Sequence, residues 1–240
     1  MSNGAELAVI VPALNEEGNI AEVVRGLLDQ SAGLVIVVDN GSTDHTADVA
    51  ADAGAVVVGE PVRGYGQACH AGSVEAIRRG ASVLVYIDGD QSSLPSELDR
   101  VTQPITRGEA DLVLGSRVLG TIESGAMGVH QRFGNWLTSA IMRRLYRIDV
   151  TDLGPYRAVR ADLLTELAMT EMTFGWPTEM MVKAARRGAR IVEVPVTWSV
   201  RHSGDSKVSG TVKGTILSGW YLLSVTFKHA FGRRPAPFRQ

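Results

Sequence analysis

The sequence has little cysteine and little net charge. Cys69 is its one cysteine among 240 residues, so no intrachain disulfide can form, which suits a reducing compartment. The formal net charge is -2, whereas a protein that wraps nucleic acid is usually clearly basic. These two shortages favour a protein of the cytoplasm and disfavour nucleic acid as a partner.

The chain also lacks a long apolar run. Its first residues show no basic start followed by an apolar stretch, so we expect no export signal. The longest uncharged apolar stretch near the C-terminus, 214–227, is shorter than the roughly 20 residues that a membrane-spanning helix needs. We therefore expect a cytoplasmic protein, either soluble or peripheral on the cytoplasmic face of a membrane.

What the first half does contain is an alternation of two patterns. The short β-branched runs that predict strands are Ala8–Val11, Leu34–Val38, Ala55–Val58, Ser82–Ile87 and Asp111–Leu114. The segments between them with helical periodicity are Ile20–Leu28, Thr46–Ala53, Gln67–Arg79 and Glu97–Thr106. The alternation predicts an α/β fold whose central sheet is mostly parallel and flanked by helices.

The second half is less regular. The elements expected there are a helix over Gln131–Tyr146, a turn and strand over Thr151–Arg160, a helix over Pro177–Arg187, a strand over Arg190–Val196 and a helix over 211–231. We expect residues 1–210 to form one domain. The segment 211–240 would then be an amphipathic helix and tail, either part of that domain or appended to it.

Polar loops follow the predicted strands of the first half. They cover Pro12–Gly18, Asp39–Asp44, Glu60–Gly66 and Asp88–Pro95. Any one of them could be an ordinary turn, because Gly, Asn, Asp, Ser and Pro favour turns. Ligands of parallel sheets, however, bind beyond the carboxyl ends of the strands. Several such loops at one edge, each with at least one carboxylate, predict a binding site.

Asp88 and Asp90 stand directly after an apolar run, in the sequence IDGD. Asp-Gly is also a common turn signal, so a structural role is the alternative. Two hard oxygen ligands at this spacing suit Mg²⁺ or Mn²⁺. The position after a strand favours the metal site.

The order of motifs resembles a known family. The motifs, in chain order, are VIVPALNEE, VVDNGSTDHT, RGYGQACHAG, YIDGDQSSLPSEL, LGSR, DLGPYRAVR, EVPVTW and RHSGDSK. Together they resemble the family 2 glycosyltransferases of GT-A fold, and within them the branch of dolichyl- and polyprenyl-phosphate sugar synthases. The resemblance covers Leu7 to Lys207.

This resemblance implies a donor site for a nucleotide sugar. It places Asp88 and Asp90 in the family's Asp-x-Asp slot, with Asp90 the better direct ligand of Mg²⁺ or Mn²⁺. It implies that Asp39 hydrogen-bonds the nucleobase and that Arg63 lies near the base and diphosphate. The residues that it implies cradle the nucleoside are Pro12, Ala13, Asn15 and Glu16. Ser92 stands where the branch often has Gln, which leaves a third protein ligand open.

Four cations are expected on the acceptor side. They are Arg117 at the end of a strand, Arg132 at the start of a helix, and Arg201 and Lys207 around RHSGDSK. Cations converging on one cleft suit a polyprenyl phosphate or the donor diphosphate. Arg132 alone is better explained as a solvated side chain.

A hydroxyl acceptor, unlike a phosphate, needs a general base, and Glu179 is the candidate. An acid in the first turn of a helix can equally cap or orient that helix.

The leading hypothesis is therefore a metal-dependent inverting glycosyltransferase, with Asp90, Glu179 and Arg117 as candidate catalytic residues and a polyprenyl phosphate as the favoured acceptor. A transferase to a soluble hydroxyl acceptor and a catalytically silent nucleotide-sugar-binding module are the alternatives. The C-terminal helix could meet a membrane surface, the domain itself or a second copy in a homo-oligomer.

Overall fold

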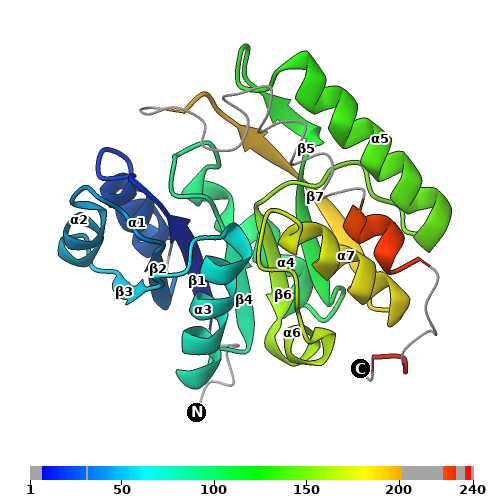
Figure 1. Ribbon diagram of the computed structural model, residues 1–240, viewed down its shortest axis with the longest axis horizontal. Coiled ribbons are helices and arrows are strands. Elements are labelled where there is room, and N and C mark those ends of the chain that lie inside the picture. The colour runs from blue at the N-terminus through cyan, green and yellow to red at the C-terminus, as the bar shows by residue number, and fades with distance from the viewer. Residues whose placement is uncertain (1–6, 31, 202–223, 231–235, 239–240) are drawn as a thin grey trace.

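The structure is a computed structural model, and it describes residues 7–30, 32–201, 224–230 and 236–238. The described residues form a seven-stranded sheet in the order β3-β2-β1-β4-β6-β5-β7 (Figure 1). The strands are β1 (Leu7–Ala13), β2 (Leu34–Asp39), β3 (Val56–Gly59), β4 (Val83–Tyr86), β5 (Leu112–Ile122), β6 (Arg157–Arg160) and β7 (Ile191–Trp198).

Most neighbouring strands run parallel. β1 pairs in parallel with β2 and β4, and β2 pairs in parallel with β3. β6 runs antiparallel to both β4 and β5, so β5 and its parallel partner β7 point the same way as β1 and β4. The carboxyl ends of six strands therefore meet at one edge, as the alternation of the first half predicts.

Helices cover both faces of this sheet. They are α1 (Ile20–Asp29), α2 (Thr46–Asp52), α3 (Tyr65–Arg78), α4 (Leu98–Thr106), α5 (Val129–Tyr146), α6 (Ala161–Leu167) and α7 (Trp176–Arg186), with a 3₁₀ turn at Pro95–Glu97. Buried residues of α1, α2 and α4 belong to one apolar cluster, and those of α3, α5, α6 and α7 belong to the other.

The strands alternate between the two clusters residue by residue. Along β1, Ala8 and Ile10 face α3, whereas Val9 and Val11 face α1. All four are fully buried. A strand covered on both faces reads as a continuous apolar run for this reason, and the side chains still alternate in direction.

The predicted bounds of one strand were wrong, and one helix was missed. β5 does not end near Leu114 but continues to Ile122, because its far half pairs with β7 through Thr121 and Ile122. Arg117 therefore lies within a strand, not at its end. The helix α6 was not predicted at all.

The described part of the C-terminal segment, 224–230, lies against the domain. Val225 and Thr226 are buried, and the hydroxyl of Tyr146 in α5 donates to the carbonyl of Thr226. Further on, Phe238 is buried and its N–H donates to the carbonyl of Arg187, 2.8 Å away. Packing on the domain is thus what the described residues show. The rest of 211–240 lies outside the described residues, and the domain division at 210 stays a prediction.

No helix in the part of the chain that the structure describes combines the length and the apolar character needed to cross a membrane.

Candidate functional site

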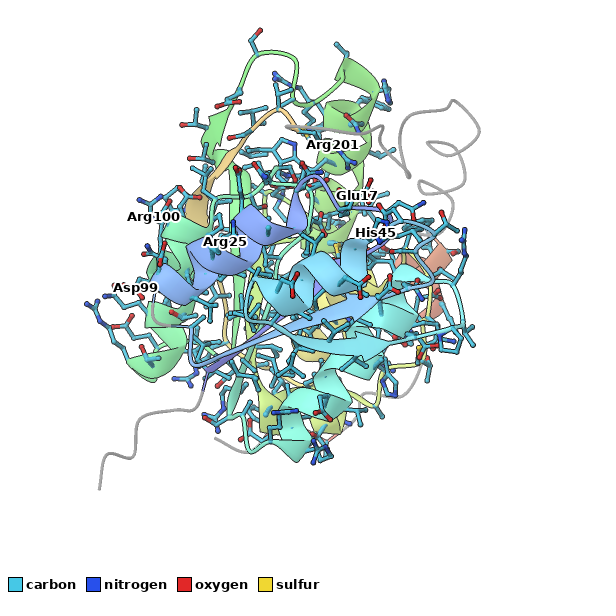
Figure 2. All side chains as sticks on the ribbon, turned by 90° about the vertical axis from the view of Figure 1, so that its left-hand side faces the viewer. Glu17, Arg25, His45, Asp99, Arg100 and Arg201 are labelled. Carbon is cyan, nitrogen blue, oxygen red and sulfur yellow. The ribbon has the colours of Figure 1, made fainter. Side chains whose placement is uncertain are left out.

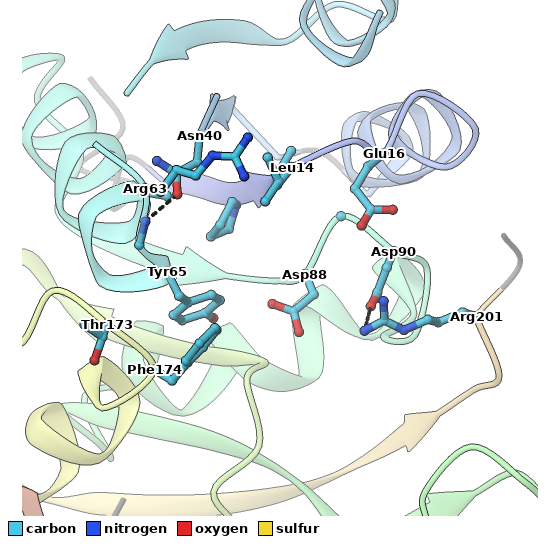
Figure 3. A pocket seen from close by; sticks show the side chains of 15 residues that line it. Leu14, Glu16, Asn40, Arg63, Tyr65, Asp88, Asp90, Thr173, Phe174 and Arg201 are labelled. Carbon is cyan, nitrogen blue, oxygen red and sulfur yellow. Dashed lines mark hydrogen bonds and ion pairs between the residues drawn. The ribbon is translucent and has the colours of Figure 1, made fainter. Parts of the chain in front are cut away.

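A cavity of about 410 Å³ lies at the carboxyl ends of β1 and β4 (Figure 3). Pro12, Ala13 and Glu16 line it from the first loop, and Asp88 and Asp90 line it from the loop after β4. Figure 3 shows Asn40 and Arg63 at one end, the pair Asp90 and Arg201 at the other, and Asp88 between them. The predicted site residues that line the cavity are Pro12, Ala13, Glu16, Arg63, Asp88, Asp90 and Arg201.

The loop after β1 is held in place by its own polar groups. The backbone N–H of Glu16 donates to the Thr46 hydroxyl at 2.8 Å, and its carboxylate accepts from the Asn19 side chain at 2.7 Å. Asn15 adopts a positive φ of 53° and accepts the N–H of Thr43 at 2.8 Å. Asn15 thus ties this loop to the loop after β2 and does not line the cavity, whereas the buried Glu16 does.

At the end of β2, Asn40 lines the cavity where the sequence pointed to Asp39. Its side-chain NH₂ donates to the carbonyls of Glu60 and Val62 at 2.9 and 2.7 Å, and its oxygen accepts the N–H of Gly64 at 2.8 Å. Asp39 accepts the N–H of Ser42 at 3.1 Å within its own turn. A base contact by Asp39 stays a prediction.

The loop that Asn40 holds carries Arg63 into the cavity. The guanidinium of Arg63 donates to the carbonyl of Gly41 at 3.0 Å, which keeps it beside the loop after β2. Gly64 follows at a φ of 158°, and a Cβ there would lie 2.5 Å from the carbonyl oxygen of Met172. Only glycine allows the chain to pass this closely, which brings the segment 172–174 over the cavity.

Asp90 is the more firmly positioned of the two aspartates. One carboxylate oxygen accepts the N–H and the hydroxyl of Ser92 at 3.0 and 2.5 Å. The other lies 2.6 Å from the Arg201 guanidinium. The carboxylate is 5% exposed, so its charge has to be balanced locally. Arg201 balances it in this structure.

Burial raises the pKa of Asp88 to about 7, and the nearby charge of Asp90 raises it as well. The charges of Arg201 and Arg117 and a hydrogen bond from Tyr65 act in the opposite direction. Two neighbouring carboxylates repel each other when both are ionised, and a cation bound between them removes this repulsion.

The two aspartates fit a divalent cation in this respect. Mg²⁺ typically takes one or two carboxylates and completes its shell with water and substrate phosphates. Among the residues that the structure describes, no group of three or more His, Cys, Asp or Glu side chains could hold a metal. The donor set thus suits a cation shared with a phosphate ligand, with Asp88 and Asp90 as the protein's oxygens. It does not suit a site closed by protein ligands alone.

Arg117 lies beside the cavity and not in its lining. Its guanidinium forms a two-pronged ion pair with the fully buried Asp152, at 2.8 and 2.7 Å, and stacks 4.8 Å from the ring centre of Trp198. These contacts engage Arg117 in joining β5 and β7 to the segment before β6. Its positive charge still acts to lower the pKa of Asp88.

The other three predicted cations do not lie together. Arg201 lines the cavity, Arg132 is exposed at the start of α5 and does not line it, and Lys207 lies outside the described residues. Of the four cations expected on the acceptor side, Arg201 is the one that lines the cavity. Arg63, expected on the donor side, lines it as well.

Glu179 is buried away from the cavity. Its carboxylate accepts the N–H groups of Thr170 and Glu171 at 2.9 and 2.8 Å and the hydroxyl of Thr170 at 2.6 Å. The ammonium of Lys183 lies 2.9 Å away. Burial acts to raise the pKa of Glu179, but these hydrogen bonds outweigh it and the pKa is lowered. The Glu179 carboxylate is therefore a weak base whose oxygens already accept hydrogen bonds. This favours a role in orienting the helix over a role as a general base.

Several lining residues were not predicted. They are Leu14, Asn40, Gly64, Tyr65, Ala68, Gly89, Thr173 and Phe174, among the described residues. Tyr65 opens α3, and its hydroxyl acts to lower the pKa of Asp88. The rings of Tyr65 and Phe174 lie close together in Figure 3, across from the loop after β1. Tyr65 stands in RGYGQ, a motif already noted, whereas Phe174 reaches the cavity through the close approach at Gly64, which no local pattern reveals.

Comparison with known proteins agrees with this geometry. The profile of the family described as Glycosyl transferase family 2 matches residues 8–168. An uncharacterised glycosyltransferase of Mycobacterium tuberculosis is 37% identical over 220 residues, which cover 90% of this chain and 95% of that protein. An undecaprenyl-phosphate mannosyltransferase of Micrococcus luteus is 33% identical over 216 residues, which cover 85% of this chain and 88% of that protein.

A solved structure extends the likeness to the fold. Glucosyl-3-phosphoglycerate synthase from Mycobacterium tuberculosis, in complex with Mn²⁺, uridine diphosphate and glucosyl-3-phosphoglycerate, matches with a TM-score of 0.75. The match covers 95% of this chain and 80% of that chain at 23% identity. At this identity the likeness concerns the fold alone.

Proposed function

The chain belongs to glycosyl transferase family 2 and has the GT-A fold, and on this premise we propose that it transfers a sugar, with inversion, from a nucleotide-sugar donor to a polyprenyl phosphate. The activity of a glycosyltransferase comes with the family. The divalent cation, the inverting course and the acceptor form the proposal. The observation that carries it is the single cavity lined by Asp88, Asp90, Arg63 and Arg201.

The donor is proposed to lie along this cavity with its nucleoside toward Pro12, Ala13 and Asn40. Its diphosphate would then meet the guanidinium groups of Arg63 and Arg201, which suit phosphate oxygens because they offer paired donors in a plane. Asp88 and Asp90 are proposed to hold Mg²⁺ or Mn²⁺, which when bound supplies positive charge that stabilises the leaving diphosphate.

The acceptor follows from the bases that the cavity offers. Its lining carboxylates are those of Glu16, Asp88 and Asp90 in the described residues, and Glu16 is engaged by Asn19. A phosphate oxygen is already ionised near neutral pH and attacks without a general base, whereas a hydroxyl needs one. The burial of Glu179 argues against its use as the base on which the hydroxyl-acceptor alternative depends. The 33% identical relative, named an undecaprenyl-phosphate mannosyltransferase, supports the same acceptor class.

In the proposed reaction, a phosphate oxygen of the acceptor attacks the anomeric carbon from the face opposite the nucleotide. A bond forms between that carbon and the phosphate oxygen. The bond from the carbon to the donor diphosphate breaks, and the nucleoside diphosphate leaves with the electron pair. The protein's part is to position the two phosphates and to exclude water from the carbon between them.

The test is transfer from a panel of radiolabelled nucleotide sugars, with Mg²⁺ or Mn²⁺, to a short polyprenyl phosphate. The matching polyprenol, which ends in a hydroxyl, is the control acceptor. We expect label in the phosphate lipid and none in the polyprenol. Transfer to the polyprenol at an equal rate would overturn the acceptor, and tight donor binding without transfer to any acceptor would favour a silent binding module.

A further inference from the structure

The helix α5 shows its apolar side to solvent. Val129, Phe133 and Trp136 are 84%, 60% and 58% exposed. Their spacing of four and three residues places them on one stripe of the helix. The rings of Phe133 and Trp136 lie 5.8 Å apart, so the stripe is a continuous apolar surface and not three isolated side chains.

The opposite side of α5 is the one that packs on the domain, and it is mostly polar. Its buried residues are Asn135, Thr138, Ser139 and Met142. A surface helix of a globular protein normally buries its apolar stripe and exposes its polar one. In α5 this order is reversed, so packing among the residues that the structure describes does not account for the stripe. Exposed apolar surface of this kind marks an interaction site.

The charges of α5 say what kind of surface the stripe meets. The segment Val129–Tyr146 contains Arg132, Arg143 and Arg144 and no acidic residue. At 100° per residue, Arg132 and Arg144 lie roughly 60° to either side of the stripe. Long arginine side chains in such positions reach sideways from an apolar surface toward anionic groups.

We propose that α5 lies on the surface of a membrane containing anionic lipid, with Val129, Phe133 and Trp136 inserted at the boundary between headgroups and acyl chains. Aromatic residues are favoured at that depth, and cations beside them meet the lipid phosphates. A twofold contact of α5 with the same helix of a second copy fits less well, because it would bring arginines of like charge together.

The position of α5 in the fold suits this surface. α5 follows the carboxyl end of β5, which points toward the same edge of the sheet as β1 and β4 (Figure 1). The same edge carries other exposed apolar side chains, with Val118 and Leu119 on β5 at 54% and 52% and Val200 after β7 at 52%. A membrane along α5 would therefore lie near the edge of the sheet that carries the cavity.

The experiment is co-sedimentation of the full chain with phosphatidylcholine vesicles, with and without phosphatidylglycerol. We expect binding to the anionic vesicles and a loss of about tenfold in the double variant Phe133→Ala/Trp136→Ala. Arg132→Ser should weaken binding about fivefold and reduce its salt dependence. The matched control is Val74→Ala/Ile77→Ala, two apolar residues on α3 that are 54% and 39% exposed, which should bind as the wild type does.

All these side chains are exposed, so the variants should keep the melting temperature of the wild type. Equal binding by the wild type and the Phe133/Trp136 variant would overturn the proposal. So would a dimer, measured by light scattering, that the variant dissociates while no form binds vesicles. The test needs neither donor nor turnover, so its failure leaves the proposed reaction standing, and failure of the transfer assay leaves this proposal standing.

Discussion

Asp90 and Arg201 form a close ion pair inside the proposed donor cavity, and this pair sets how the cavity meets a cation. The two side chains are 2.6 Å apart, with Arg201 28% exposed. A divalent cation that takes the same carboxylate oxygen has to displace the guanidinium. In the proposed site, Arg201 would therefore compete with the metal for Asp90 before the donor binds, and would contact the diphosphate once the metal has displaced it.

We predict that Arg201→Ala raises the affinity for Mn²⁺ in the absence of nucleotide by about fivefold, the value of a partly exposed ion pair. The same variant should bind the donor nucleotide more weakly, because a diphosphate contact is lost. Titration calorimetry measures both. Arg201→Lys, which keeps the charge, is the control. Its affinities for Mn²⁺ and for the nucleotide should lie between those of the wild type and those of Arg201→Ala. An unchanged affinity for Mn²⁺ in Arg201→Ala would show that the pair does not compete.

A second prediction at this scale concerns Glu179. Replacing it with Gln leaves the ammonium of Lys183 without its buried charge partner, which we expect to cost about 3 kcal/mol of folding stability. Because the carboxylate lies away from the cavity, the turnover of the folded variant should stay near that of the wild type. Thermal unfolding and kcat measured well below the melting temperature separate the effects. A stable variant that has lost turnover would instead restore Glu179 as a catalytic base.

At the scale of elements, an ion-pair cluster fastens β5 to β7 at the end remote from the cavity. Asp111, fully buried just before β5, accepts from the Arg190 guanidinium at 3.1 and 2.8 Å and from its N–H at 2.9 Å. Arg160 lies 3.8 Å away. Burial acts to raise the pKa of Asp111, but the bonds from Arg190 outweigh it and the pKa is lowered.

The direction of that shift gives a pH prediction. A carboxyl whose pKa is lower in the folded state stabilises the fold above its unfolded pKa of about 4, and this stability is lost as the pH falls through the folded pKa. Asp111→Asn should thus cost about 2 kcal/mol at pH 7. The difference between variant and wild type should shrink as the pH falls below about 4.

Urea unfolding of the variant and the wild type, at pH 7 and again below about pH 4, measures this difference in stability. The control is the exposed Asp149→Asn, which should match the wild type at either pH. A cost that does not change with pH would mean that packing, not charge, explains the role of Asp111.

The success of sequence reasoning at this scale depended on local patterns. β1 to β4 and α1 to α4 were predicted because their apolar periodicity is set by contacts on both faces of the sheet. The outer half of β5 was missed because its residues after Leu114, GSRVLGTI, look like a loop and become a strand only by pairing with β7. Likewise Arg117 takes Asp152 as its partner across 35 positions of sequence, which no local pattern reveals.

At the scale of the whole molecule, the parallel sheet explains how much of the site could be predicted. Loops that follow parallel strands converge at one edge, so Pro12, Asp88 and Asp90 could be grouped without coordinates. The sheet does not determine where the side chains of helices and loops outside it point. Glu179 was a candidate base at a helix start, but the segment 170–171 covers its carboxylate. Phe174 reaches the cavity only because Gly64 lets that segment approach.

The central claim is that Asp90 holds a divalent cation that in turn holds the donor diphosphate. The most direct measurement is the shift in melting temperature caused by a panel of nucleoside diphosphates, with and without Mn²⁺, in the wild type and in Asp90→Ala. The control is Asp99→Ala, a carboxylate exposed on α4 and well separated from Arg201 in Figure 2.

The account predicts a shift for one nucleotide that requires Mn²⁺, is kept by Asp99→Ala and is lost in Asp90→Ala. An equal shift in Asp90→Ala, or one that does not depend on the metal, would contradict it.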